Sequence, residues 1–112
     1  DGTCLRDYIH VMDLSEGHIN ALNFLFKDFP KIININLGTG LGSSVLDLIN
    51  TFSNVNNIDV PYRVTSRREG DVPMLVADNS LSKKTLNWEP KRSLELMCRD
   101  GWKWKSQYPN GF

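Results

Sequence analysis

The sequence predicts a small α/β domain, a mixed lobe of short strands and about four helices. Apolar residues recur at three- and four-residue steps, the pattern of a helix with one buried face, in three ranges: 14–25, 45–52 and 94–102. Other stretches alternate polar with apolar residues or are rich in β-branched ones, as strands are, at 6–11, 32–37 and 60–65. A fourth, short helix is expected at about 78–86.

The first element is a strand or extended segment at Arg6 to Val11, RDYIHV, where polar and apolar residues nearly alternate. Asp13 is the expected N-cap of the helix that follows, because its side chain can accept from free backbone N–H groups. Pro30 marks the end of this helix. Ile32 to Leu37 is expected to be a strand.

Ser43 or Ser44 is expected to cap the second helix, which ends within 54–57 at turn-forming residues. A further strand is expected at 60–65, and Pro61 favours an edge position because proline lacks a backbone N–H. The polar residues that follow, 66–73, are expected to form a loop.

The short third helix is expected to open at 78–80, DNS, and to end near Leu86. Ser93 is the expected cap of the last helix, and Glu95 in its first turn suits the positive end of the helix dipole. Trp88, Trp102 and Trp104 are interpreted first as packing residues.

Composition excludes several classes of function. The 112 residues suffice for one domain, 1–112, with a modest core. Lys plus Arg (13) equals Asp plus Glu (13), so no general attraction to nucleic acid or anionic membrane is expected. No apolar run could span a bilayer, and no signal peptide is visible.

The cysteines indicate a protein of a reducing compartment, and the histidines and cysteines together do not indicate a metal site. Cys4 and Cys98 lie far apart with no CxxC pattern, so two free thiols in the cytoplasm are expected. His10 and His18 are the only histidines, and no zinc-ligand spacing occurs. His10, in a short extended segment, is interpreted as a packed or surface residue rather than a catalyst.

The glycine run Gly38-Thr-Gly-Leu-Gly42 resembles a dinucleotide-binding turn, but its spacing argues against one. That fingerprint is Gly-x-Gly-x-x-Gly, whereas here the third glycine comes one residue early. A P-loop would need a lysine that Ser43 and Ser44 do not supply. The run is interpreted as a turn in which glycines supply positive φ.

Several spaced motifs together resemble the C-terminal part of the UDP-glucose 4-epimerases, which are extended short-chain dehydrogenases/reductases. They occur in the same order across the whole chain, as DGTCLRDYIHVMDLSEGH at 1–18, NLGTGLGSSVLDLI at 36–49, RREGDVP at 67–73, LNW at 86–88 and the closing WKWKSQYPNGF. The chain opens at Asp1 without an initiator methionine, as expected for a piece of a longer protein.

The resemblance implies an NAD-binding Rossmann domain before Asp1 and a homodimer at full length. Its members interconvert UDP-glucose and UDP-galactose: NAD oxidises the sugar at C4, the keto-sugar turns, and the hydride returns to its other face. A Tyr-x-x-x-Lys pair handles the proton, but Tyr8, Tyr62 and Tyr108 are not followed by lysine at that spacing. No catalytic, cofactor-binding or metal-binding residue is therefore expected within this chain.

The resemblance implies instead a substrate-binding lobe. Arg6 and Arg68 match arginines that bind the UDP diphosphate, and Asp71 matches an acceptor for a ribose hydroxyl. Tyr8 and Val45 match positions that line the nucleotide pocket. Guanidinium groups suit this role because their paired donors fit phosphate oxygens.

Departures from the family pattern leave the sugar range open. Position 4 is often glycine in the family, and the small Cys4 is expected to have little effect. Leu75 stands where family members vary between bulky and small residues around the sugar, so acceptance of N-acetylated sugars is undecided. Arg67 is as compatible with a solvated loop charge as with a ligand. For Asp7 two roles are considered, a local salt bridge with Arg6 and a structural role.

Three alternatives to this epimerase lobe stay open. The chain could be a stand-alone nucleotide-sugar-binding module, part of another UDP-sugar epimerase of the same family, or an interaction domain that keeps only the fold. The presence or absence of a glycine-rich loop and Tyr-x-x-x-Lys before Asp1 separates the first of these from the epimerase.

Overall fold

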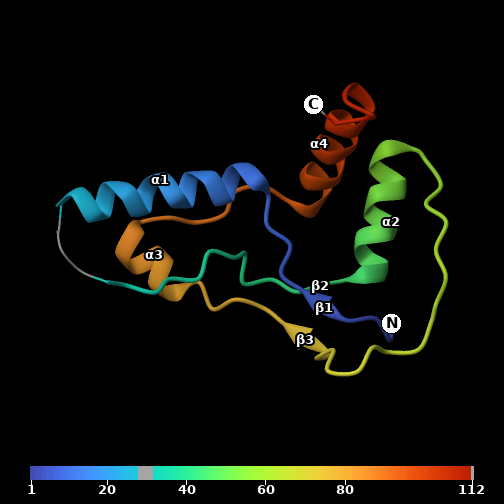
Figure 1. Cartoon of the computed structure of the whole chain (residues 1–112), viewed down its shortest axis with the longest axis horizontal. Helices are drawn as coiled ribbons and strands as arrows, with labels where there is room; N and C mark the ends of the chain where they lie inside the picture. Colours follow the sequence, from blue (N-terminus) through green and yellow to red (C-terminus); the bar gives the residue numbers. More distant parts are fainter. Residues whose placement is uncertain (28–31, 112) are drawn as a thin grey trace.

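The computed structural model describes residues 1–27 and 32–111. Within them it contains four helices and one three-stranded sheet, the predicted α/β class (Figure 1). The elements in chain order are β1 (Leu5–Arg6), α1 (Val11–Lys27), β2 (Ser43–Ser44), α2 (Val45–Asn56), β3 (Met74–Leu75), α3 (Ser80–Leu86) and α4 (Leu94–Gln107).

The sheet joins three segments that are distant in sequence, in the order β2-β1-β3. β1 runs antiparallel to β2, with Leu5 opposite Ser44, and parallel to β3, with Leu5 opposite Met74. The N-terminal end of the chain therefore lies between the start of α2 and the end of the 57–73 loop (Figure 1).

The predicted strands are largely wrong. Of 6–11, predicted as a strand or an extended segment, only Arg6 is in a strand, 7–10 are neither strand nor helix, and Val11 begins α1. Neither 32–37 nor 60–65 is a strand. Because 60–65 is not a strand, the edge-strand position predicted for Pro61 is also wrong. β-Branched composition favours an extended backbone, but a strand also needs a partner, and here pairing occurs only where 5–6, 43–44 and 74–75 meet.

Helix α1 begins at Val11, two residues before its predicted N-cap. The Nδ1 atom of His10 accepts from the backbone N–H of Met12 at 3.1 Å, so His10 supplies the capping contact predicted for Asp13. Pro30, the predicted end of this helix, lies outside the described residues.

The predicted caps of α2 and α4 are confirmed. The Ser44 hydroxyl accepts from the backbone N–H of Asp47 at 2.9 Å, and the Asp47 carboxylate accepts from that of Ser44 at 3.1 Å. Ser93 caps α4 through one bond, in which its hydroxyl accepts from the backbone N–H of Leu96 at 3.3 Å. α3 begins at Ser80, within the predicted opening.

The buried carboxylate of Asp13 ties α1 to the 87–93 connection. Its side chain is fully buried and accepts from the backbone N–H groups of Lys91 and Arg92, at 3.2 and 3.0 Å, and from the Arg92 guanidinium. Trp88, which is 2% exposed, donates its indole N–H to the Asp13 carbonyl at 3.0 Å. The predicted packing role of Trp88 is confirmed.

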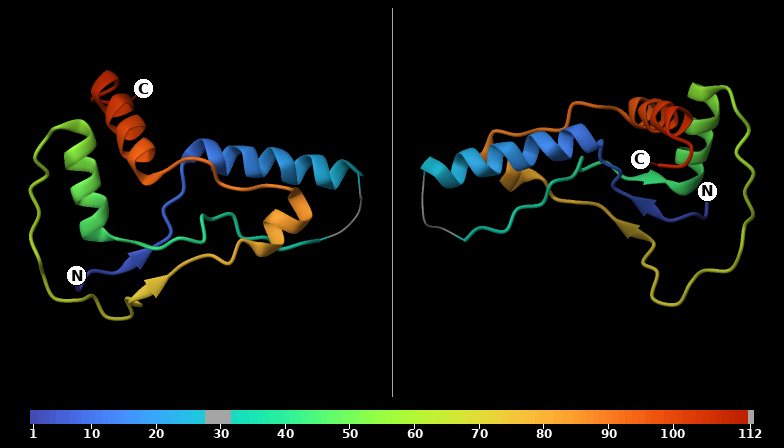
Figure 2. Two further views of the ribbon diagram at one scale, coloured as in Figure 1. Left: turned by 180° about the vertical axis from the view of Figure 1, so that it is seen from behind. Right: turned by 45° about the horizontal axis from the view of Figure 1, so that its top comes forward.

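The chain is extended rather than closely packed around one core. α1 packs on α3 at one end, and α2 packs on α4 at the other (Figure 2). Among the described residues only Leu86, Trp88 and Cys98 are buried apolar ones, so the expected core is incomplete. The radius of gyration is 16.8 Å, whereas a compact domain of this length has about 13 Å.

None of the helices in the described part of the chain combines the length and the apolar character needed to cross a membrane. Cys4 and Cys98 are free thiols, as predicted.

Asp13→Ala is expected to lower the free energy of unfolding by about 2–4 kcal/mol, because it leaves the backbone N–H groups of Lys91 and Arg92 without their acceptor and removes one of the two carboxylates that contact the Arg92 guanidinium. Urea unfolding followed by circular dichroism measures this loss. Glu16→Gln is the matched control, since Glu16 contacts the same Arg92 at 2.8 Å from a more exposed position. It should cost much less than Asp13→Ala, because exposed ion pairs contribute little to stability. Equal costs for the two variants would contradict the role given to Asp13.

Candidate functional site

The structure brings together three of the predicted site residues, Arg6, Arg68 and Asp71. An Nη atom of Arg6 lies 2.5 Å from one Asp71 carboxylate oxygen, and an Nη atom of Arg68 lies 3.9 Å from the other. Arg6 is held at the end of β1, where it also donates to the Leu5 carbonyl at 2.7 Å. The Arg68 side chain is 86% exposed. Two guanidinium groups against one carboxylate leave a net positive site.

Cys4 adds a contact that its small size does not predict. Its thiol donates to the Asp71 carboxylate at 3.3 Å, and an Nη atom of Arg67 lies 3.5 Å from the same sulfur. The Cys4 hydrogen bond and the charges of Arg6 and Arg68 together hold the pKa of Asp71 below its usual value, against the opposing effect of burial. Asp71 is therefore a fixed anion between the arginines.

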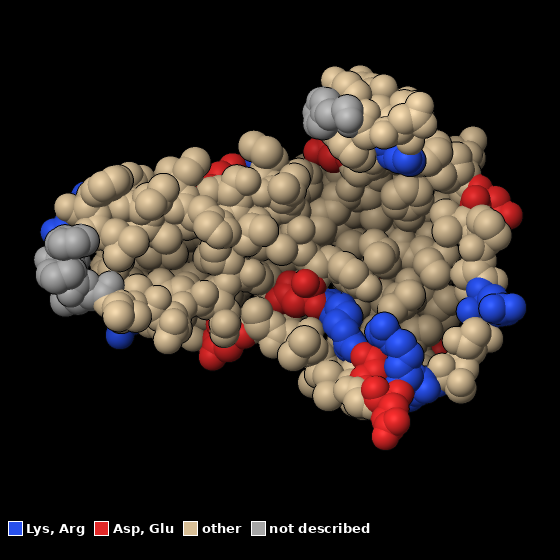
Figure 3. Space-filling view, in the orientation of Figure 1, with Lys and Arg blue, Asp and Glu red and all other residues tan. Residues whose placement is uncertain are grey.

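Acidic and basic side chains gather together where β1, β3 and the 57–73 loop meet, whereas the rest of this face carries few charges (Figure 3). A cavity of about 370 Å³ opens beside Arg6, and Leu75 and Asp78 also line it. The basic site thus borders a hollow that a small polar molecule could enter.

The backbone N–H groups of the glycine run are occupied by the side chain of Asp7. Its carboxylate accepts from the N–H groups of Thr39 at 2.8 Å, Gly40 at 3.0 Å and Ala77 at 3.2 Å, and from the Thr39 hydroxyl at 2.5 Å. Asp7 is thus structural, one of the two roles considered for it, and Arg6 pairs with Asp71 instead.

Two glycines make this arrangement possible. A Cβ atom at Gly38 would lie 2.5 Å from the Ala77 Cβ and 2.7 Å from an Asp7 carboxylate oxygen, which no side chain tolerates. Gly40 has φ +74°, so it supplies the positive φ expected of the turn.

This turn does not fit NAD. The pyrophosphate of a dinucleotide binds to backbone N–H groups at such a turn, but here the Asp7 carboxylate takes those donors. The structure therefore agrees with the spacing argument, and no chemistry of the cofactor is assigned to these residues.

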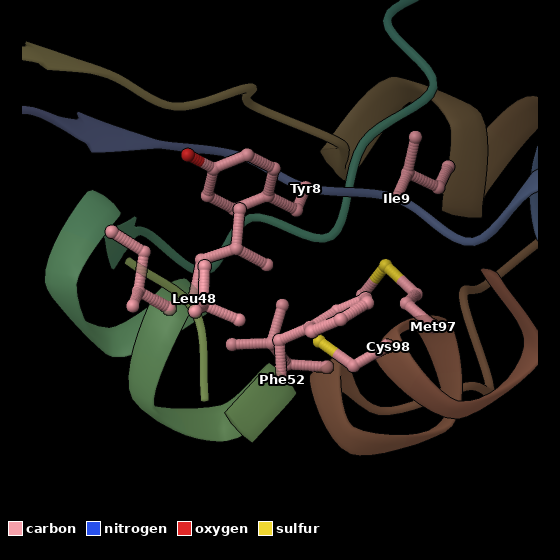
Figure 4. Close-up of a pocket in the computed structure, with 9 residues that line it drawn as sticks. Tyr8, Ile9, Leu48, Phe52, Met97 and Cys98 are labelled. Carbon is pink, nitrogen blue, oxygen red and sulfur yellow. The ribbon is translucent and has the colours of Figure 1, made fainter. Parts of the chain in front are cut away.

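Tyr8 and Val45 take no part in the ion pairs of Arg6, Arg68 and Asp71. Tyr8 follows β1 and lines an apolar groove between α2 and α4, with its hydroxyl directed away from Phe52 and Met97 (Figure 4). Val45 begins α2 directly after Ser44, the partner of Leu5, and is 37% exposed. The antiparallel register carries Val45 toward Cys4, which contacts Asp71.

The groove has a volume of about 480 Å³. It carries no charged side chain; its lining residues are Tyr8, Ile9, Leu48, Ile49, Phe52, Val60, Leu94, Met97 and Cys98.

Sequence reasoning missed the contacts of Cys4 and Asp7. Asp7 stands directly after Arg6, a predicted ligand, and its carboxylate could accept from a turn rich in N–H donors. A single sequence does not show that positions 7 and 39 lie close together in the fold. Cys4 lies 67 positions from its partner Asp71, and its side chain has no spacing pattern that points there.

Asp7→Asn should destabilise the chain by about 1–3 kcal/mol near neutral pH, because its amide NH₂ would face N–H donors. Burial raises the pKa of Asp7, but the hydrogen bonds from Thr39, Gly40 and Ala77 outweigh it and hold the pKa below the ordinary 3.8. The pKa of Asp7 is lower in the folded chain than in the unfolded one. The ionised carboxylate therefore stabilises the fold fully at pH values above the unfolded pKa, and this stabilisation is lost as the pH falls through the folded pKa.

The difference in unfolding free energy between the wild type and Asp7→Asn should therefore narrow as the pH falls below about 4. Chemical unfolding at a series of pH values measures it. A difference of constant size across this range would contradict the assignment.

Comparison with known proteins gives one consistent result, although no family model matches the chain. The chain is 47% identical over 118 residues to a UDP-glucose 4-epimerase of Bacillus subtilis, a match that covers 100% of the chain and 33% of that protein. It therefore spans about a third of the length of the relatives it matches.

Solved structures agree with the sequence match. A Stenotrophomonas maltophila UDP-glucose 4-epimerase with bound NAD and formylated UDP-arabinopyranose aligns with a TM-score of 0.92 at 46% identity, over 97% of this chain and 32% of that one. A Bifidobacterium longum UDP-glucose 4-epimerase in complex with NAD⁺ and UDP aligns with a TM-score of 0.92 at 38% identity. This alignment covers 100% of this chain and 33% of that one. In sequence and in fold, the chain matches the C-terminal third of the UDP-glucose 4-epimerases, members of the short-chain dehydrogenase/reductase family.

Proposed function

We propose that this chain is the substrate-binding lobe of a longer protein that interconverts UDP-glucose and UDP-galactose. The observation that carries the proposal is the cluster of Arg6, Arg68 and Asp71 in a chain that matches UDP-glucose 4-epimerases over its whole length. The 112 residues form a single lobe, and the NAD-binding Rossmann domain belongs to the part of the longer protein that precedes Asp1.

The two arginines would bind the diphosphate of the nucleotide sugar. Of the five N–H donors of the Arg6 guanidinium, the bonds to Leu5 and Asp71 use two, which leaves donors for an anion. Arg68, exposed and 3.9 Å from Asp71, is free to turn onto a second phosphate. A net positive site suits a doubly charged diphosphate.

The remaining site residues would bind the nucleoside. Each oxygen of the Asp71 carboxylate keeps a second lone pair beside its present partner, so the carboxylate can accept from a ribose hydroxyl while it holds Arg6. Tyr8 and Val45 would pack on the uridine. Contact with the nucleotide leaves the sugar free to turn, as epimerisation requires, because the binding energy comes from a part of the substrate that does not react.

The family resemblance further implies a homodimer in the cytoplasm. Two unpaired thiols fit a reducing compartment.

The intact protein should convert UDP-galactose into UDP-glucose, which a coupled UDP-glucose dehydrogenase assay detects. An intact protein that binds UDP but leaves both sugars unchanged would contradict the proposed reaction and favour a nucleotide-sugar-binding module.

Arg68→Ala in the intact protein should raise KM for UDP-galactose by roughly 10- to 100-fold, the equivalent of one or two charge-assisted hydrogen bonds. Steady-state kinetics measure it. Arg63→Ala, an exposed arginine in the same loop, is the matched control and should leave KM within about twofold. An unchanged KM for Arg68→Ala would exclude its diphosphate role.

A further inference from the structure

The apolar face of α2 lacks a complete partner. Leu48, Ile49 and Phe52 recur at helical spacing and all line the groove between α2 and α4, yet no residue of α2 is a buried apolar one. Of the residues that line the groove, Cys98 alone is buried. An amphipathic helix in a stable fold normally covers such a face against a neighbour.

α4 covers only one side of this face. The Phe52 and Trp102 rings meet edge to face at 6.0 Å, and the Asn56 side chain donates to the Cys98 carbonyl at 3.2 Å. These contacts fix the two helices against each other. They leave the groove open beside Tyr8, Leu48 and Leu94, where Figure 4 shows side chains directed into it from α2, α4 and the segment after β1.

The lining chemistry limits what can fill the groove. No lining residue is charged, and the Tyr8 hydroxyl is directed away from Phe52 and Met97 (Figure 4). A phosphate or a sugar would lose its water there without gaining hydrogen bonds. An apolar polypeptide face would gain free energy from the same burial.

The N-terminal end of the chain is fastened to the same helix. The hydroxyl of Ser44, which caps α2, donates to the Asp1 carboxylate, and the backbone N–H of Leu46 donates to the Thr3 hydroxyl at 3.3 Å. A polypeptide that precedes Asp1 therefore starts beside the first turn of α2 (Figures 1 and 2). The relatives are about three times as long as the chain, which matches their C-terminal third.

We infer that the groove between α2 and α4 is filled, in the longer protein of the proposed function, by an apolar face of the segment that leads into Asp1. This segment completes the core that the 112 residues leave open. It also supports Tyr8 from the side opposite its hydroxyl, so the same contact steadies one wall of the proposed nucleotide site.

Photo-crosslinking of the intact protein tests this inference. Benzoylphenylalanine replaces Phe52 or, in a second variant in case the first does not fold, Leu94; both side chains line the groove. Tyr62 is the matched aromatic control, because it is 58% exposed and does not line the groove. After irradiation, peptide mass spectrometry identifies the partner of each position.

The expected result is an intramolecular crosslink from position 52 or 94 to residues that precede Asp1, at least about tenfold more abundant than that from position 62. Crosslinks confined to residues 1–112, crosslinks between two copies, or none from a folded variant at either position would each overturn the inference. Activity is assayed separately: crosslinks in a protein without epimerase activity would overturn the proposed function alone, and activity without crosslinks would overturn the groove assignment alone.

Discussion

The Asp7 carboxylate holds together the three segments on which the site depends. It follows β1, which carries Arg6, and accepts from N–H groups of the turn before β2 and of the residues after β3. One ionised group thereby satisfies three backbone donors, of which those of Thr39 and Ala77 are partly buried. The two-residue strands that flank it could not by themselves fix the distance between Arg6 and Asp71.

This arrangement changes the meaning of the glycine run at 38–42. Its glycines allow a close approach and a positive φ, as in nucleotide-binding turns, but the anion that they receive is a side chain of the same chain. In the proposed function, the positive charge that attracts the nucleotide comes instead from the guanidinium groups of Arg6 and Arg68, which lie on either side of the Asp71 carboxylate. Under the proposed function, binding by side chains would hold the nucleotide of the substrate while its sugar turns.

The two ends of the molecule differ in how completely they are packed. At the end formed by α1 and α3, Trp88 is buried and the Asp13 carboxylate accepts hydrogen bonds from the 87–93 connection. These contacts hold that connection against α1. The end formed by α2 and α4 has good caps and an edge-to-face aromatic pair, but an open groove. Local signals therefore suffice to form its helices, whereas closure of the groove is assigned, by inference, to the segment that leads into Asp1.

The sequence alone determined the helices and the caps of α2 and α4, because periodic apolar residues and capping residues such as Ser44 and Ser93 act within a few positions of one another. It also named Arg6, Arg68 and Asp71 through their resemblance to a family. Only the tertiary structure decided which strands pair, since β1, β2 and β3 are each two residues long and pairing depends on what lies opposite. It likewise decided the partners of Asp7, Asp13 and Cys4, because a carboxylate or thiol bonds to whichever donors and acceptors the fold brings near, and no local pattern records them.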